Sequence, residues 1–206
     1  MAIVLRATKG SALTYGEADG NFIDLDNRTK VAWQNLRGQM SVAGVSNPPT
    51  TVAYRGIPLN NYGPDTVCEC AVVIHIPHDY VVGTDIYPHG HVLTSTASTG
   101  VVRWGFDLTY AQEFDANVGG TPTAGNAFFA PVTAYVNMTM QANYQDVHLL
   151  MEDTTPVTLP GLAPDSVILM RVFRDAPNVA DTYPDGVFLM NVDLYYQSQG
   201  FGTAAR

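Results

Sequence analysis

Apolar and polar residues alternate with a period of two along most of the chain from residue 50 onward. In the segment 101–110 the apolar set is Val102, Trp104, Phe106, Leu108 and Tyr110. In the segment 66–76 it is Cys68, Cys70, Val72, Ile74 and Ile76. Successive side chains of a β-strand point to opposite faces, so this pattern is typical of strands with one buried face.

Eight segments predict strands, and turn signals such as Pro160-Gly161 separate them. The strand segments are Thr51–Arg55, Thr66–Ile76, Ile86–Ser95, Val101–Tyr110, Phe129–Met140, Asp146–Met151, Ser166–Arg174 and Val187–Gln197. No helix-length segment interrupts them, which argues against a parallel βαβ architecture. We therefore expect a mainly β protein whose body, residues 50–206, is an antiparallel β-sandwich of jelly-roll type. The sequence leaves the strand order open.

Residues 1–45 follow a different pattern, which predicts an N-terminal arm and an α-helix. Thr14 and Glu17 fit a capping box, in which each side chain bonds the other residue's backbone amide. Apolar positions then recur at spacings of four and three, as in an a/d heptad seam: Ala18, Phe22, Leu25, Thr29, Ala32 and Leu36. Two interpretations stay open. The seam joins copies of the chain in a trimeric coiled coil, or the helix packs on its own domain.

Composition and charge limit the possible partners. Only 14% of the 206 residues are charged, against roughly 25% in ordinary soluble domains. A surface so poor in charge is expected to be partly covered by partners. The net charge of −9 and the lack of a basic cluster exclude nucleic acid as a partner. No apolar run approaches the roughly 20 residues that span a bilayer. The first six residues do not resemble a signal peptide, so we expect no membrane contact and synthesis in the cytoplasm.

The histidine pair His89 and His91 is the candidate for metal binding. The two residues lie two apart on a predicted strand, so their rings project from one face. With a third ligand from His75, His78 or Asp85 they are candidate ligands for zinc or nickel. The alternative is that they are ordinary polar residues on an outward face or a subunit contact. We adopt this alternative and expect neither a metal nor a cofactor.

The sequence offers no catalytic constellation. There is no Gly-x-Ser-x-Gly elbow and no glycine-rich phosphate loop. A bridge between Cys68 and Cys70 would be strained, so both are predicted to be buried free thiols. We therefore expect that the protein is not an enzyme.

Tyrosines predicted near strand ends and turns suggest a second kind of surface. They are Tyr80, Tyr87, Tyr183, Tyr195 and Tyr196. Such residues could form a platform on which a carbohydrate stacks. Sandwich cores and subunit contacts use tyrosine equally well, because the ring is apolar and the hydroxyl polar. Both interpretations stay open.

Two segments resemble structural proteins of tailed bacteriophages. Residues 9–25, KGSALTYGEADGNFIDL, are similar to the opening of many tail and head fibre proteins, where KGSPLTxxExDxNFxxL leads into a helix. Residues 76–91, IPHDYVVGTDIYPHGH, continuing to Trp104, are similar to a β-rich domain of phage structural proteins. The proline of the first motif is Ala12 here, and Gly20 replaces a larger residue, so the helix start is expected to be looser. The resemblance implies a trimeric virion protein.

On these grounds we expect a non-enzymatic virion structural protein. The first hypothesis is a capsid decoration (cement) protein that binds and stabilises the phage head as a homotrimer. Its partners would be its own copies and the major capsid protein or other virion proteins. Ile3, Val4 and Leu5 in the arm are the candidate capsid contacts. The alternative is a short head or tail fibre protein that binds a receptor glycan.

Overall fold

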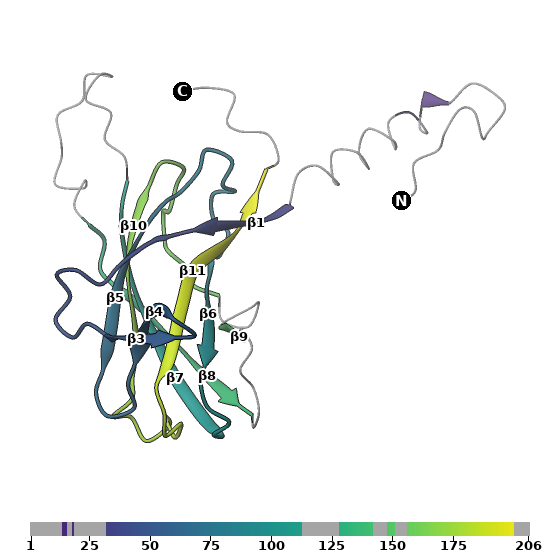
Figure 1. Cartoon of the computed structure of the whole chain (residues 1–206). Helices are drawn as coiled ribbons and strands as arrows, with labels where there is room; N and C mark the ends of the chain where they lie inside the picture. The colour runs from purple at the N-terminus through teal and green to yellow at the C-terminus, as the bar shows by residue number, and fades with distance from the viewer. Residues whose placement is uncertain are drawn as a thin grey trace.

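Two antiparallel β-sheets pack face to face as a sandwich (Figure 1). The computed structural model describes Thr14, Tyr15, Ala18 and residues 32–112, 128–141, 148–150 and 156–199. Sheet A consists of β1 (Ala32–Arg37), β3 (Thr50–Tyr54), β4 (Ile57–Tyr62), β6 (Tyr87–Thr94), β9 (His148–Leu150) and β11 (Val187–Ser198). Sheet B consists of β2 (Gln39–Ser41), β5 (Cys68–His75), β7 (Gly100–Ala111), β8 (Val132–Met140) and β10 (Val167–Arg174). The predicted mainly β class and antiparallel sandwich are confirmed.

The strand order is nested. β7 pairs with β8, β6 with β9, β5 with β10 and β4 with β11. The chain changes sheet at each step from β4 to β7, turns back within sheet B, and changes sheet again at each step to β11. This folded-over ribbon of eight strands is jelly-roll-like. It places β11, the last strand of the described part, between β4 and β6 in sheet A.

The core lies between the sheets and consists of the residues on one side of each strand's alternation. The predicted inward set of β7 is buried without exception: Val102, Trp104, Phe106, Leu108 and Tyr110. Burying one such side chain contributes roughly 1.5–3 kcal/mol. Cys68 and Cys70 are buried free thiols in the same core, as predicted. Burial raises the pKa of the Cys70 thiol to about 11.

The predicted helix is wrong at its C-terminal end. Ala32 and Leu36, the last two positions of the heptad seam, lie on β1. This strand pairs with β11 over its whole length, from Ala32 opposite Ser198 to Arg37 opposite Asp193. Pairing covers an edge of β11 that would otherwise expose unpaired backbone groups. Leu36 still packs against the core, but with the period of a strand.

The remaining N-terminal predictions lie mostly outside the described residues. Ala18 N donates to Thr14 O at 3.0 Å, which is the spacing of a helical turn. The undescribed seam and arm residues are Phe22, Leu25, Thr29, Ile3, Val4 and Leu5. Within the described segments, no helix has the length and apolarity needed to cross a membrane.

Gly38 carries the chain from sheet A to sheet B between β1 and β2. Its amide donates to Val192 O at 3.0 Å. A Cβ atom at this position would lie 2.2 Å from Val72 Cγ1, so only glycine fits without displacement of the core. Strands that switch sheets form the corners of sandwiches. Within the described residues, β1 and β2, which precede residue 50, are therefore part of the two sheets.

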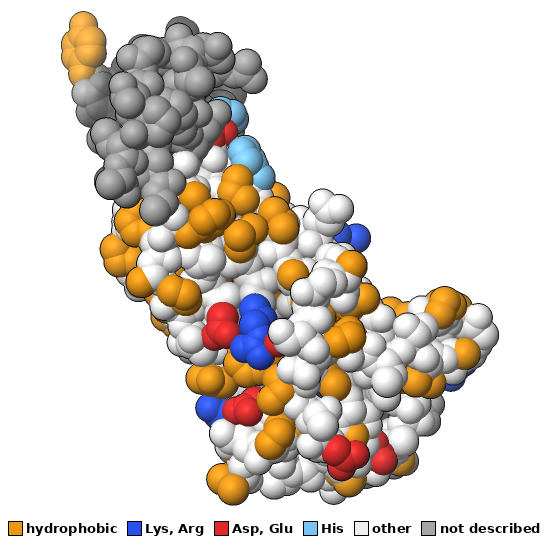
Figure 2. All heavy atoms as spheres, turned by 90° about the vertical axis from the view of Figure 1, so that its left-hand side faces the viewer, with side chains coloured by type: hydrophobic (Ala, Val, Ile, Leu, Met, Phe, Trp, Pro, Cys, Tyr) orange, Lys and Arg blue, Asp and Glu red, His pale blue; other side chains and the backbone are white. Residues whose placement is uncertain are grey.

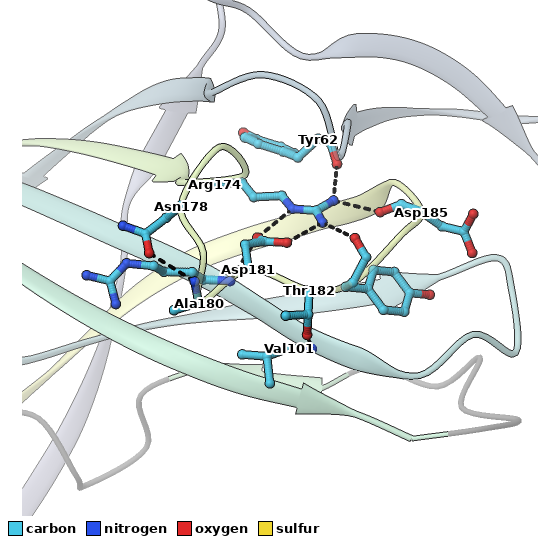
Figure 3. Close-up of polar contacts among 10 residues, drawn as sticks. Tyr62, Val101, Arg174, Asn178, Ala180, Asp181, Thr182 and Asp185 are labelled. Atoms are coloured by element: carbon cyan, nitrogen blue, oxygen red, sulfur yellow. Dashed lines mark hydrogen bonds and ion pairs between the residues drawn. The ribbon is translucent and has the colours of Figure 1, made fainter.

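A buried arginine organises one end of the sandwich (Figure 3). The Arg174 side chain is fully buried and bonds both carboxylate oxygens of Asp181, at 2.7 and 2.9 Å. It also donates to the carbonyl oxygens of Tyr62, Tyr183 and Asp185, at 3.0, 2.6 and 2.6 Å. All five N–H donors of the guanidinium are thereby used. The network fixes the connection between β10 and β11 against β4.

Candidate functional site

The outer face of sheet B carries an apolar groove among the described residues. Val73 and Leu169 face each other across β5 and β10 and remain 45% and 37% exposed. The groove has a volume of about 290 Å³ and is lined by Ala71, Val73, Thr109, Pro131, Leu169 and Arg171, among others. Figure 2 shows hydrophobic side chains gathered on this side of the molecule, with acidic and basic side chains adjoining them. Solvated sheet faces are usually polar, and this one exposes apolar side chains in its place.

A row of ionic contacts borders the groove. Arg171 Nε bonds Glu69 Oε2, and Arg171 Nη1 donates to Asp107 Oδ2 at 2.9 Å. Thr133 donates to the other Asp107 oxygen at 2.7 Å, so the row spans four strands. Burial raises the pKa of Glu69, but Arg171 and the amides of Ser46 and Asn47 outweigh it and lower the pKa overall. The carboxylate therefore stays ionised at neutral pH.

An aromatic stack continues the same face. The Phe173 ring covers Gly105, where a Cβ atom would lie 2.2 Å from Phe173 Cζ. Tyr135 packs edge-on against Phe173, with ring centroids 6.0 Å apart. Arg103 lies over the Tyr135 ring and Arg171 over the Phe173 ring, each at 4.1 Å. Cation–π and ionic contacts together hold these side chains in fixed positions, as a docking surface requires.

The predicted histidine pair lies on the other sheet. His89 and His91 project from β6 on the outer face of sheet A, and Asp193 of β11 lies beside both. The sequence analysis missed Asp193. The sequence does carry a signal for Asp193: along β11, the apolar residues that face the core have odd numbers at first and even numbers later, so that position 193 faces outward.

The three residues that the sequence leaves open as a third ligand lie elsewhere. His75 and His78 lie near Asp165, at 3.6 and 3.1 Å, at the end of β5 in sheet B. Asp85 accepts a hydrogen bond from Thr158 at 2.6 Å. None of the three joins His89 and His91, because β5 and the turn after it do not pair with β6, and Asp85 bonds Thr158.

The structure separates the five tyrosines, which the sequence leaves open as either a carbohydrate platform or core and contact residues. Tyr80, Tyr183 and Tyr196 are buried in the core. Tyr87 and Tyr195 are half-buried on the outer face of sheet A. There Trp33, which is 48% exposed, packs edge-on against Tyr87 with ring centroids 5.1 Å apart. Of the five tyrosines, Tyr87 therefore joins an exposed aromatic pair with Trp33 near the start of β1.

Comparison with known proteins gives only distant structural likenesses. No protein-family model matches the sequence, and no curated protein matches it. A carbohydrate-binding module solved in complex with β-1,4-galactotriose is 10% identical, with a TM-score of 0.31, over 82% of this chain and 92% of that chain. The Merkel cell polyomavirus virus-like particle is 10% identical, with a TM-score of 0.20, over 85% of this chain and 76% of that chain. Likenesses this weak carry no argument about function.

Proposed function

We propose that the chain is a non-enzymatic structural protein of a tailed-phage particle, and that it binds the capsid as a decoration protein. The observation that carries the proposal is the apolar groove on the outer face of sheet B. The resemblance of residues 9–25 to phage fibre proteins supplies the class of particle. The jelly-roll-like strand order is compatible with this class, since viral capsid domains use it.

The groove provides the apolar centre that a docking surface needs, and the ionic row provides its rim. Interfaces are typically apolar at the centre and polar at the edge, with arginine and aromatic residues enriched. A stable interface buries roughly 800 Å² per partner, so the groove would be one part of a larger contact. A protein that binds only the assembled shell stabilises it by its binding free energy.

The test is co-sedimentation of the purified chain with undecorated capsids. Leu169→Lys places a charge in the groove and is expected to abolish binding. Val179→Lys is the matched control, because Val179 is 96% exposed in the β10–β11 connection. Phe22→Asp tests whether the N-terminal seam contributes. Equal binding by the Leu169 and Val179 variants would show that the groove is not part of the capsid contact. No binding by the unmodified chain would refute the decoration role.

A fibre protein that binds a receptor glycan is the second candidate. The exposed Trp33–Tyr87 pair favours it, because aromatic faces stack on sugar rings. A glycan array probed with the full chain tests this candidate. Binding that is lost in Trp33→Ala and kept in Leu169→Lys would support it over the decoration role.

A further inference from the structure

Three potential metal ligands meet on the outer face of sheet A. His89 Nε2 and His91 Nε2 each lie 3.5 Å from Asp193 Oδ2. One ligand atom from each residue lies within 4.8 Å of the other two. The histidines come from β6 and the carboxylate from β11, which are adjacent paired strands. The sheet itself therefore holds the three groups together.

A β-bulge turns Asp193 toward the histidines. The pairing of β11 with β6 shifts register between Leu189 and Asn191, so Met190 is an extra residue. Before the bulge Val187 and Leu189 face the core, and after it the core positions are Val192, Leu194 and Tyr196. Without the extra residue the alternation would point position 193 into the core. Bulges that redirect a side chain in this way are frequent near functional sites.

The distances fit metal coordination better than direct hydrogen bonding. Ordinary N–H···O bonds measure about 2.7–3.2 Å, shorter than the 3.5 Å that separates each imidazole from Asp193. Zinc binds histidine nitrogen and carboxylate oxygen at about 2.0–2.2 Å, so two ligands of a tetrahedral site lie about 3.4 Å apart. Both distances from an imidazole nitrogen to Asp193 Oδ2 match this ligand-to-ligand distance.

Neighbouring residues orient two of the three ligands, Asp193 and His89. Asn35 and Asn191 donate to Asp193 Oδ2 at 3.3 and 3.0 Å. The Tyr195 ring stacks on His89 with centroids 4.3 Å apart. Groups that orient the ligands in this way are characteristic of metal sites. His89 and Asp193 are buried, whereas the His91 side chain is 28% exposed and offers access from solvent.

We propose that His89, His91 and Asp193 form a binding site for one divalent transition-metal ion of the zinc type. Two imidazoles and one carboxylate suit zinc, nickel or ferrous iron, and do not suit magnesium or calcium, which prefer oxygen ligands. Three protein ligands leave one tetrahedral position for water. The Arg37 guanidinium lies 3.6 Å from the other Asp193 oxygen and is 76% exposed, so it can move away when a cation binds. The ion links β6 to β11.

Titration calorimetry of the full chain with zinc chloride tests the proposal, with magnesium chloride as the second ligand. The expected result is one zinc ion per chain and no heat from magnesium. His91→Asn and Asp193→Asn are expected to weaken zinc binding by roughly 100-fold or more, because even changes around the ligands weaken metal sites by about 10–100-fold. The Asp193 change keeps the side-chain shape, and the His91 side chain is partly exposed, so both variants are expected to fold.

His78→Asn is the matched control, because His78 also lies beside an aspartate but stands in the turn after β5, away from β6 and β11. It is expected to bind zinc as the unmodified chain does. Zinc is also expected to raise the thermal midpoint of the unmodified chain and of His78→Asn, and not of His91→Asn. Failure of the unmodified chain to bind zinc would overturn the proposal. So would undiminished binding by His91→Asn, or binding lost in His78→Asn.

Discussion

The buried Arg174 network gives a stability prediction that can be worked from the contacts. The change is Arg174→Met, which keeps an unbranched apolar side chain and removes the guanidinium with its charge and donors. Asp181, whose side chain is 2% exposed, then loses its ion-pair partner. The carbonyl oxygens of Tyr62 and Tyr183, bonded in buried surroundings, lose their donors as well. These groups cannot all reach water, so the loss in the free energy of unfolding is expected to be large.

The magnitude follows from the groups left unpaired. Removing one partner of a buried ion pair costs about 3–5 kcal/mol, and a buried carbonyl without a donor about 1–3 kcal/mol. Asp181 keeps one hydrogen bond, from Arg103 N at 3.0 Å, which limits the sum. We expect Arg174→Met to lower the free energy of unfolding by about 4–6 kcal/mol. For a chain of this size that is a fall in Tm of roughly 10–20 °C.

Urea unfolding with thermal melting measures the change. Arg55→Met is the matched control, because Arg55 is exposed at the β3–β4 turn, with its guanidinium 5.5 Å from the Tyr54 ring. It is expected to change stability by less than about 1 kcal/mol. Adding Asp181→Asn to Arg174→Met should restore at least about 2 kcal/mol, since the buried charge is removed. A loss for Arg174→Met as small as that of the control would refute the reasoning.

Three further predictions concern single sites. Gly105→Ala is expected to lower the urea midpoint by an amount equal to roughly 1–3 kcal/mol, because the new Cβ collides with Phe173, and Phe173→Leu in the same chain should relieve it. Burial raises the pKa of Glu69, but Arg171 lowers it, so that in the folded protein the pKa lies below its ordinary value of 4.5. Ionised Glu69 therefore stabilises the fold above that pH. This contribution to stability is lost as the pH falls through the folded-state pKa. Stability measured from about pH 7 to about pH 3 should therefore decline less steeply in Glu69→Gln, and an unchanged slope would contradict this. The Cys70 thiol, with a pKa near 11 in the core, should react with a thiol reagent only at the rate of unfolding, and rapid labelling of the native chain would show that it is accessible.

Alternation predicted the sheets well because each strand buries one face. The eight predicted strands all exist, and the inward residues of β7 are those expected. The missed β4 contains Pro58, Asn60 and Asn61, which are typical of loops. Its hairpin turn uses Arg55 and Gly56, both at positive φ, in place of the usual Asn-Gly. The local sequence therefore did not predict β4, because the conformation of this segment depends on its pairing with β3 and β11.

The metal candidate was only half visible in the sequence. His89 and His91 are neighbours on one strand, so their spacing alone places them on one face. Asp193 is about a hundred residues away, and only the pairing of β11 with β6 brings it to them. A bulge was also needed to turn it outward, and bulges do not follow from a regular period. Of this site, the sequence predicted what lies within one strand and missed what lies between strands.

The formation of β1 changes how a trimer could assemble. Because Ala32–Arg37 pair with β11, the heptad seam can extend no further than residue 31. It then contains Ala18, Phe22, Leu25 and Thr29, which is less than two heptads and includes one polar position. Helices shorter than about 12–15 residues are marginal in water, and a seam this short adds little association energy. We therefore expect the purified chain to be monomeric in light scattering at micromolar concentration, and to form trimers only on the capsid. A stable trimer in solution would contradict this expectation.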